Sequence, residues 1–172
     1  MMKKQLMWLG APALFALSMG ANAGVVDLFS LDQGKYTDSA LGGGGVGGSV
    51  GAGDPTILGG NRDLYVELLT QAFPGNDASA QIAGGVFNFS VDSGSTGTAQ
   101  IQWDGADASS TIDTTGLGGV DLTEGGSLTG FSIETLFSDG GFEFVVSAYT
   151  DATTWTSVSF SASAVALGSP VT

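Results

Sequence analysis

Carboxylates supply most of the chemistry that this sequence can offer. The chain has 172 residues, of which 17 are aspartate or glutamate, and it contains no histidine and no cysteine. Histidine is the usual general base and the commonest metal ligand, and it activates many serine and cysteine nucleophiles. Ser-His-Asp triads, Cys-His pairs and histidine-ligated zinc sites are therefore excluded.

The densest group of aspartates lies in the run WDGADASSTID. This run contains Asp104, Asp107 and Asp113, and Asp121 and Glu124 follow a little further along. Calcium is a hard cation that takes carboxylate and carbonyl oxygens, so Asp104, Asp107 and Asp113 are candidate ligands of a structural calcium ion. The spacing differs from that of an EF-hand loop. Turn chemistry and surface solvation are the alternative explanation for this group.

Two aromatic residues are candidates for ligand binding. Trp155 alternates with serines, which favours exposure of its ring, and Tyr149 lies close to it in the sequence. Exposed rings of this kind can stack on sugar rings, as amphipathic aromatic side chains do in binding sites. Trp103, by contrast, shares a face with Ile101, so we expect Trp103 to pack in the core.

Three glutamates lie on or near predicted strands. Paired carboxylates such as Glu67, Glu134 and Glu143 can hydrolyse glycosidic bonds. Solvent-facing charge explains these residues more simply, so we expect no enzymatic activity. Arg62 is the only arginine in the chain, and we expect it to pair with Asp63 or another carboxylate in a structural role.

The strongest pattern of a structural element is a hairpin from Phe131 to Tyr149. Asp139-Gly140 is the dipeptide preferred in a two-residue type I′ turn, and alternating apolar runs flank it on both sides. Because the turn and the alternation agree on one register, we expect the inner face of this hairpin to form the centre of the core. The residues of that face are Phe131, Ile133, Phe137, Phe142, Phe144 and Val146.

Alternation of apolar and polar residues predicts further strands. The predicted segments are residues 25–31, 64–69, 85–91, 98–103, 110–114, 120–123 and 155–167. We expect 85–91 and 98–103 to form a second hairpin through the loop SGSTG. Glycine dominates 41–53, which predicts a flexible loop. Eight or nine short strands with Gly-rich loops predict an all-β fold, an antiparallel β-sandwich with a jelly roll as one form of it.

The first 23 residues have the pattern of a secretory signal peptide. Lys3 and Lys4 give a charged start, an apolar run follows, and Ala21-Asn22-Ala23 is an A-x-A cleavage site. Residues 24–172 then form one exported domain with no membrane span, because no later run is long and apolar enough. This mature chain has two basic residues against 17 acidic ones. Its charge repels phosphate backbones, so we expect no nucleic-acid partner.

Three segments carry a resemblance to a known group of proteins. They are ILGGNRDLYVE at 57–67, the stretch from GTAQIQWDGADASS to GLGGVDLT at 97–123, and FEFVVSAYTDATTWTSVSF at 142–160. Together they resemble exported bacterial proteins of the PEP-CTERM type, which have a signal peptide, a Gly/Ser/Thr-rich β domain and a C-terminal sorting tail. The sorting tail itself is not present in this chain, and the resemblance brings no catalytic motif with it.

These observations predict a non-enzymatic structural or matrix-associated protein, secreted or associated with the cell envelope after cleavage near Ala23. Two alternatives stay open. One is a carbohydrate-binding β-sandwich module that uses Trp155 and Tyr149 to bind an extracellular polysaccharide. The other is a self-assembling fibre or surface-layer subunit, in which strand edges pair between chains. Calcium is the candidate cofactor.

Overall fold

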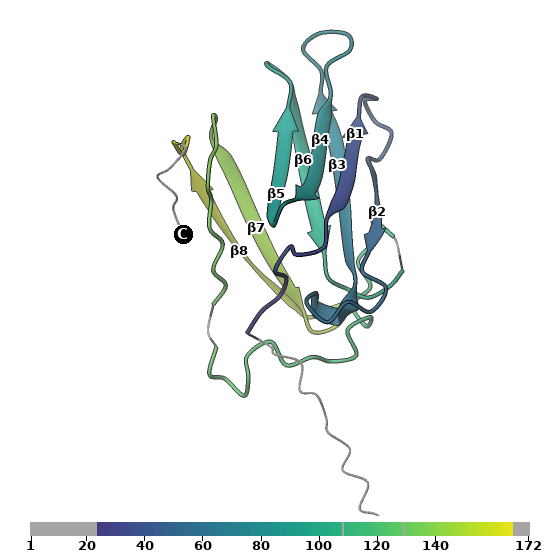
Figure 1. Ribbon diagram of the computed structural model, residues 1–172, viewed down its shortest axis with the longest axis vertical. Coiled ribbons are helices and arrows are strands. Elements are labelled where there is room, and N and C mark those ends of the chain that lie inside the picture. Colours follow the sequence, from purple (N-terminus) through teal and green to yellow (C-terminus); the bar gives the residue numbers. More distant parts are fainter. Residues whose placement is uncertain (1–23, 108, 129, 167–172) are drawn as a thin grey trace, which may run out of the picture.

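Eight β-strands and one short 3₁₀ turn make up the part of the chain that the computed structural model describes, residues 24–107, 109–128 and 130–166 (Figure 1). The elements in order are β1 (Gln33–Asp38), β2 (Val46–Val50), the turn η1 (Leu58–Gly60), β3 (Arg62–Thr70), β4 (Ala78–Ala83), β5 (Val86–Val91), β6 (Thr96–Gln102), β7 (Phe142–Tyr149) and β8 (Trp155–Ala162). The predicted all-β class is confirmed, and these strands pair antiparallel. The predicted signal peptide, 1–23, lies outside the described residues. No helix within the described ranges is long and apolar enough to cross a membrane.

The strands form three sheets. One has the order β1-β4-β5, a second has the order β2-β3-β6, and the third is the two-stranded sheet β7-β8, at one side of the molecule in Figure 1. The hairpin predicted between residues 85–91 and 98–103 is wrong, since β5 pairs with β4 and β6 pairs with β3. Both strands instead direct apolar side chains at one core from different sheets. These side chains are Phe87 and Val91 on β5 and Ala99 and Ile101 on β6.

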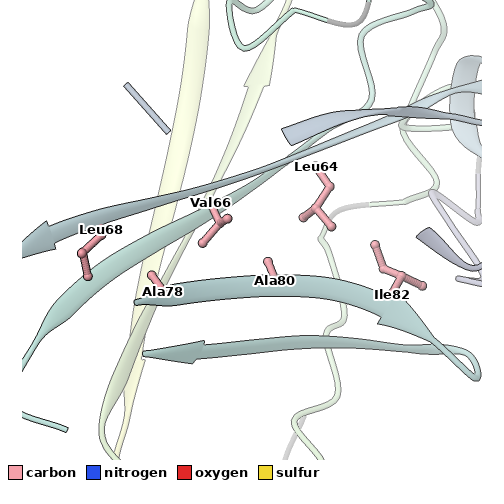
Figure 2. Close-up of a cluster of buried hydrophobic side chains, with 6 residues drawn as sticks. All are labelled: Leu64, Val66, Leu68, Ala78, Ala80 and Ile82. Carbon is pink, nitrogen blue, oxygen red and sulfur yellow. The ribbon is translucent and has the colours of Figure 1, made fainter. Parts of the chain in front are cut away.

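The core lies between β3 and β4. Leu64, Val66 and Leu68 share one face of β3, because successive strand residues point to opposite faces, and each is at most 1% exposed. They pack against the apolar face of β4, which consists of Ala78, Ala80 and Ile82. Figure 2 shows these six side chains in the space between the two strands. Of the two strands that build the core, the sequence predicted β3 but not β4.

The predicted hairpin from Phe131 to Tyr149 is wrong in its pairing. β7 pairs with β8 across the loop 150–154, and the segment leading up to the Asp-Gly pair forms no strand. β8 offers β7 well-matched partners along its whole length. For example, Phe144 lies opposite Phe160, and their ring centroids are 5.2 Å apart. Aromatic cross-strand pairs of this kind each stabilise a sheet by roughly 0.2–1 kcal/mol.

The core predicted on that hairpin is wrong as well. Phe131 and Phe137 are 51% and 57% exposed, and Phe142, Phe144 and Val146 are half-buried. Without a paired strand before Asp139, the two apolar runs do not combine into one inner face. The β3-β4 cluster forms the centre of the core instead.

The Gly-rich segment 41–53 contains strand β2, so the prediction of a flexible loop is wrong for its residues 46–50. Antiparallel pairing with β3 places Gly47 beside Tyr65. A Cβ atom on Gly47 would run into the carbonyl oxygen of Leu64 and the ring of Tyr65. Glycine at this position therefore permits a close approach of the two strands.

A buried network around Arg62 joins the start of the described chain to β3. The Arg62 guanidinium forms an ion pair with Asp27 at 2.8 Å, and both side chains are at most 1% exposed. Its other donors reach the side-chain oxygen of Gln33 and the carbonyl oxygen of Leu31. The partner of Arg62 is Asp27 and not Asp63, because neighbouring residues on β3 point to opposite faces.

Three of the short strands predicted from alternation do not form. Residues 25–31, 110–114 and 120–123 are turns and irregular segments, and the predictions for them are wrong. The first of these segments is held instead by the Arg62 network and by an isolated bridge between Asp27 and Ile57. Polar contacts, and not the strand pairing that the sequence predicted, hold residues 25–31 in place.

Four aspartates close turns with a threonine two residues later. In each case the carboxylate accepts one hydrogen bond from the threonine backbone N–H and one from the threonine hydroxyl, at 2.6–2.8 Å. The pairs are Asp54–Thr56, Asp113–Thr115, Asp121–Thr123 and Asp151–Thr153. These bonds favour the charged carboxylate, so they lower the pKa of each of the four aspartates. Asx turns of this kind shape the connecting segments, including the loop between β7 and β8.

Candidate functional site

Three aspartates from distant parts of the chain meet beside the β3-β6 pair. Asp63 lies on β3, whereas Asp104 and Asp107 lie in the segment that follows β6. One carboxylate oxygen from each residue lies within 4.8 Å of those from the other two. Asp63 is 1% exposed, Asp104 is 6% exposed, and Asp107 is exposed. The group, which we call the carboxylate cluster, is therefore buried on one side and open to solvent at Asp107.

The register of β3 and β6 brings two further polar side chains to this cluster. Gln102 lies directly opposite Asp63, so the two side chains leave the same face of the sheet with Cβ atoms about 4.5–5.5 Å apart. Tyr65 follows Asp63 by two residues and shares that face. One face of this strand pair is thus apolar and faces the core, and the other is polar where Asp63 lies.

The segment after β6 is tied back onto this polar face. The backbone N–H of Asp113 donates to Oδ2 of Asp104 at 2.8 Å, and the side-chain N–H of Gln102 donates to the carbonyl oxygen of Ser110 at 3.1 Å. Gly116 is needed at the end of the segment, because a Cβ atom there would overlap the carbonyl oxygen of Asp104. These contacts place residues 104–107 and 109–116 against the sheet beside Asp63.

Several buried oxygens at the cluster have no hydrogen-bond partner among the described residues. They are both carboxylate oxygens of Asp63, Oδ1 of Asp104, Oε1 of Gln102 and the hydroxyl of Tyr65. The great majority of buried polar atoms in folded proteins are hydrogen-bonded. Burying a carboxylate without a compensating partner costs several kcal/mol. The cluster therefore holds several buried oxygens that can accept a hydrogen bond or bind a cation and that no described residue satisfies.

Burial and mutual repulsion disfavour a state in which all three aspartates of the cluster are negatively charged. Burial raises the pKa of Asp63 to about 7, together with the negative charges of Asp104 and Asp107. Burial also raises the pKa of Asp104 and that of the Tyr65 hydroxyl. As carboxylates, Asp63 and Asp107 are both acceptors, so a hydrogen bond between them forms only when one of them carries a proton. A proton or a bound cation would relieve this repulsion.

The structure brings together two of the three aspartates that the sequence suggests as calcium ligands. Asp104 and Asp107 belong to the cluster, whereas Asp113 contacts it only through its backbone N–H, and its carboxylate is bonded to Thr115. Sequence reasoning misses Asp63, because its place depends on the pairing of β3 with a strand far along the chain. One signal was present, since extending the predicted strand 64–69 by one residue puts Asp63 on the same face as Tyr65.

The predicted aromatic site lies at the end of the β7-β8 hairpin. Tyr149 and Trp155 are direct cross-strand partners, and their rings stack with centroids 5.9 Å apart and planes 24° apart. Trp155 is 56% exposed and Tyr149 is 38% exposed. The same face of the hairpin carries the hydroxyls of Ser147, Ser157 and Ser159. The sequence alone does not show this stacking, because it requires the β7-β8 register.

The remaining candidate residues lie elsewhere. Glu67 lies on β3, Glu143 lies on β7, and Glu134 lies in the irregular segment before β7. Trp103 is half-buried, and its indole N–H donates to Asp27 at 2.9 Å. Trp103 thus contributes to the buried network around Arg62, which is a structural role.

Strand β8 is exposed from Trp155 to Ser161. Every side chain from Trp155 to Ser161 is exposed, including those of Val158 and Phe160 at 58% and 40%. One edge of β8 pairs with β7, and no strand of the described ranges pairs with its other edge. The eight residues of β8, WTSVSFSA, carry no charge in a chain of net charge −13. β8 is therefore an uncharged edge strand.

Comparison of the chain with protein-family models, with curated proteins and with solved structures found no match. Functional conclusions for this chain therefore depend on its own residues, above all on the carboxylate cluster and on the β7-β8 hairpin.

Proposed function

We propose that this protein is a non-enzymatic, exported structural protein of the bacterial cell envelope or extracellular matrix, and that it joins to a second copy of itself through strand β8. The single observation that carries this proposal is the exposed, uncharged edge of β8. The signal-peptide pattern and the resemblance to PEP-CTERM-type proteins support export. The lack of histidine and cysteine in the sequence favours a structural role over catalysis.

The architecture that we propose is an antiparallel β-sandwich of the sheets β1-β4-β5 and β2-β3-β6. The packing of β3 against β4 across one apolar core supports this arrangement. Consecutive strands change sheets between β1 and β2, β3 and β4, and β5 and β6. Such crossings are typical of Greek-key and jelly-roll sandwiches. In this proposal the β7-β8 hairpin is an addition to the sandwich that is available for contacts with partners.

The backbone of an edge strand gives β8 its binding capacity. An unpaired edge presents a row of N–H and C=O groups, which is a template for pairing with another chain. Proteins commonly protect such edges with lysine, proline or inward-pointing charges, and β8 has none of these. The exposed side chains of Val158 and Phe160 add apolar surface beside the edge. These properties suit β8 to pairing by strand addition.

A second copy is the partner that the charge distribution favours. The chain is strongly acidic, so most of its surface repels another copy at close range. β8 is uncharged over eight consecutive residues. Antiparallel pairing of β8 with its counterpart around a two-fold axis therefore brings no like charges opposite each other. This contact allows two copies to meet without the repulsion found elsewhere.

We expect the purified protein to sediment as dimers or larger assemblies and Val158→Glu to sediment as monomers. A glutamate on β8 places two negative charges close together at the paired edge, where they repel each other. The dissociation constant of the dimer should therefore rise by more than about tenfold, which equals about 1.4 kcal/mol. Analytical ultracentrifugation over a range of concentrations measures it. Val145→Glu is the matched control, because Val145 is 62% exposed but lies on β7. A monomeric wild type, or equal effects of the two substitutions, would contradict the proposal.

A second candidate function is polysaccharide binding, which the stacked pair of Tyr149 and Trp155 favours. The pair presents exposed aromatic surface at one end of a face lined with serine hydroxyls. Aromatic surface stacks on the apolar face of a sugar, and hydroxyls can bond its polar edge. This candidate uses the same hairpin but a different face from the apolar one that carries Val158.

If the second candidate is right, Trp155→Ala should weaken binding to a polysaccharide by about two- to tenfold, which corresponds to the roughly 0.5–1.5 kcal/mol of an aromatic contact. Affinity electrophoresis in gels that contain one polysaccharide each measures the retardation of the protein. Phe137→Ala is the control, since Phe137 is an aromatic residue of similar exposure, 57%, outside the hairpin. Equal retardation of the two variants would remove Trp155 from the site, and no retardation of the wild type in any gel would reject this function.

A further inference from the structure

The carboxylate cluster lacks a basic partner in the described chain. The only basic side chains between residues 24 and 172 are Lys35 and Arg62. Arg62 points to the opposite face of β3 and is paired with Asp27, and Lys35 is exposed on β1, in the other sheet. The charge that balances Asp63, Asp104 and Asp107 must therefore come from solution.

A second observation, independent of the acidic residues, also indicates a ligand at this place. Gln102 is 5% exposed, and its Oε1 has no hydrogen-bond partner among the described residues. Its amide nitrogen donates to the Ser110 carbonyl, which fixes the side chain between the sheet and the segment that carries Asp107. Because Gln102 lies directly opposite Asp63 in the ladder, this neutral oxygen leaves the sheet beside the buried carboxylate.

We infer that Asp63, Asp104 and Asp107 form a calcium site, with Oε1 of Gln102 beside them as a neutral oxygen ligand. This inference goes beyond the proposed function, since it depends on β3, β6 and the residues Asp104 and Asp107 that follow β6, and not on the β7-β8 hairpin. It also replaces Asp113, which the sequence suggests as a ligand, with Asp63. The ion joins a buried strand to the segment that covers it.

The size and chemistry of the cluster fit calcium. Calcium binds six to eight oxygens at about 2.3–2.6 Å, so ligands on opposite sides of one ion are roughly 4.6–5.2 Å apart. The cluster's oxygens lie within 4.8 Å of one another. Magnesium holds its ligands at about 2.0–2.1 Å in strict octahedral geometry and gives up its water reluctantly. A partly buried cluster of carboxylate and amide oxygens is therefore the kind of site that calcium occupies more readily.

The exposed position of Asp107 supplies the route to solvent. Asp63 and Asp104 are buried, but Asp107 reaches the surface, so an ion can enter there and keep a water on that side. Binding connects β3 with the segment after β6. The native arrangement of these residues exists only in the folded chain. Calcium therefore stabilises the folded state by an amount that grows with the calcium concentration relative to its dissociation constant.

Calorimetric titration of the purified protein, first treated with EGTA, tests this inference. We expect one calcium ion to bind per chain and the melting temperature to rise with calcium concentration. Asp63→Asn should weaken calcium binding at least about tenfold, the lower end of what loss of even an outer-shell partner costs a metal site. Its melting temperature without calcium should not fall, since the substitution removes a charge from a repulsive cluster.

Two further variants make the result decisive. Asp107→Asn removes the negative charge of the exposed ligand, so it should weaken calcium binding in a protein whose buried residues are unchanged. Asp113→Asn is the matched control and should bind calcium like the wild type, because the Asp113 side chain lies outside the cluster. No calcium binding by the wild type at millimolar concentration, or wild-type binding by Asp63→Asn, would overturn the site. Equal stabilisation by magnesium would overturn the choice of ion.

Discussion

Replacing Arg62 with alanine is expected to lower the free energy of unfolding by about 3–5 kcal/mol, the cost of breaking a buried ion pair from one side. The substitution leaves Asp27 buried without its counter-charge, and it removes the donors to Gln33 and Leu31. Asp27 keeps a hydrogen bond from Trp103, but this neutral donor does not balance a charge. A domain is stable by only about 5–15 kcal/mol, so a large share of the stability would be lost.

Urea unfolding followed by tryptophan fluorescence measures this loss. Lys35→Ala is the control, because Lys35 is basic but exposed on β1, and it should change stability by no more than about 0.5 kcal/mol. Asp27→Ala and the double variant complete a mutant cycle. The double variant should lose much less than the sum of the two single variants, since each removes the same contact. Similar small effects of Arg62→Ala and Lys35→Ala would contradict a buried pair.

A second large effect is expected from Gly47→Ala, which should lower the free energy of unfolding by about 1–3 kcal/mol, the usual cost of overpacking. The added methyl group would meet the carbonyl oxygen of Leu64 and the ring of Tyr65. Backbone cannot yield as a flexible side chain can, so β2 would have to move away from β3. Weaker pairing of β2 would also disturb Tyr65, which lies beside the carboxylate cluster.

Gly34→Ala is the matched control for this prediction. Gly34 also lies on a strand, β1, but a Cβ atom there would meet nothing within 4 Å. The substitution should be neutral or stabilise slightly, because alanine loses less conformational entropy on folding than glycine does. Urea unfolding of both variants compares them directly. Equal stability of Gly47→Ala and Gly34→Ala would mean that residues 46–50 are not held closely against β3.

The all-β class and the strands β3, β5, β6, β7 and β8 were predictable from alternation, but the pairing of the strands was not. Asp139-Gly140 predicted a two-residue type I′ turn, but the pair forms only a bend with positive φ at neither residue, and β7 pairs with β8 across a loop closed by Asp151. Turn preference concerns a few residues, whereas pairing is decided by contacts along the whole strand. The two effects favour different partners here, and the longer ladder prevails.

Small residues explain two of the three strands that alternation did not reveal, β2 and β4. β4 contains three alanines, and β2 contains two glycines. Such strands carry little hydrophobic signal of their own, and glycine disfavours an extended strand in isolation. The role of these small residues is visible only in the folded molecule. Ala78 and Ala80 pack in the core beside Leu64, and the missing side chain of Gly47 leaves room for Tyr65.

The candidate site was predictable to the extent that it is local. Asp104 and Asp107 are close in sequence, so their acidic run was visible, whereas Asp63 joins them only through the pairing of β3 with β6. Asp113 seemed equivalent to them by spacing. Its carboxylate instead accepts two hydrogen bonds from Thr115 in an Asx turn. Aspartate forms such turns as readily as it binds metal ions, so the residue type alone does not distinguish the two roles.

The Asp-x-Thr turns give the connecting segments of this protein a tolerance of acid. Their four aspartates have pKa values below the 3.8 of an ordinary aspartate. A group whose pKa is lowered in the folded state contributes stability above its ordinary pKa and loses it only as the pH falls through the lowered value. At a pH near 3.8, where a free aspartate is half protonated, a larger fraction of these four carboxylates stays charged. For the exported protein that we propose, turns closed in this way would hold the loops in shape when the surroundings become acidic.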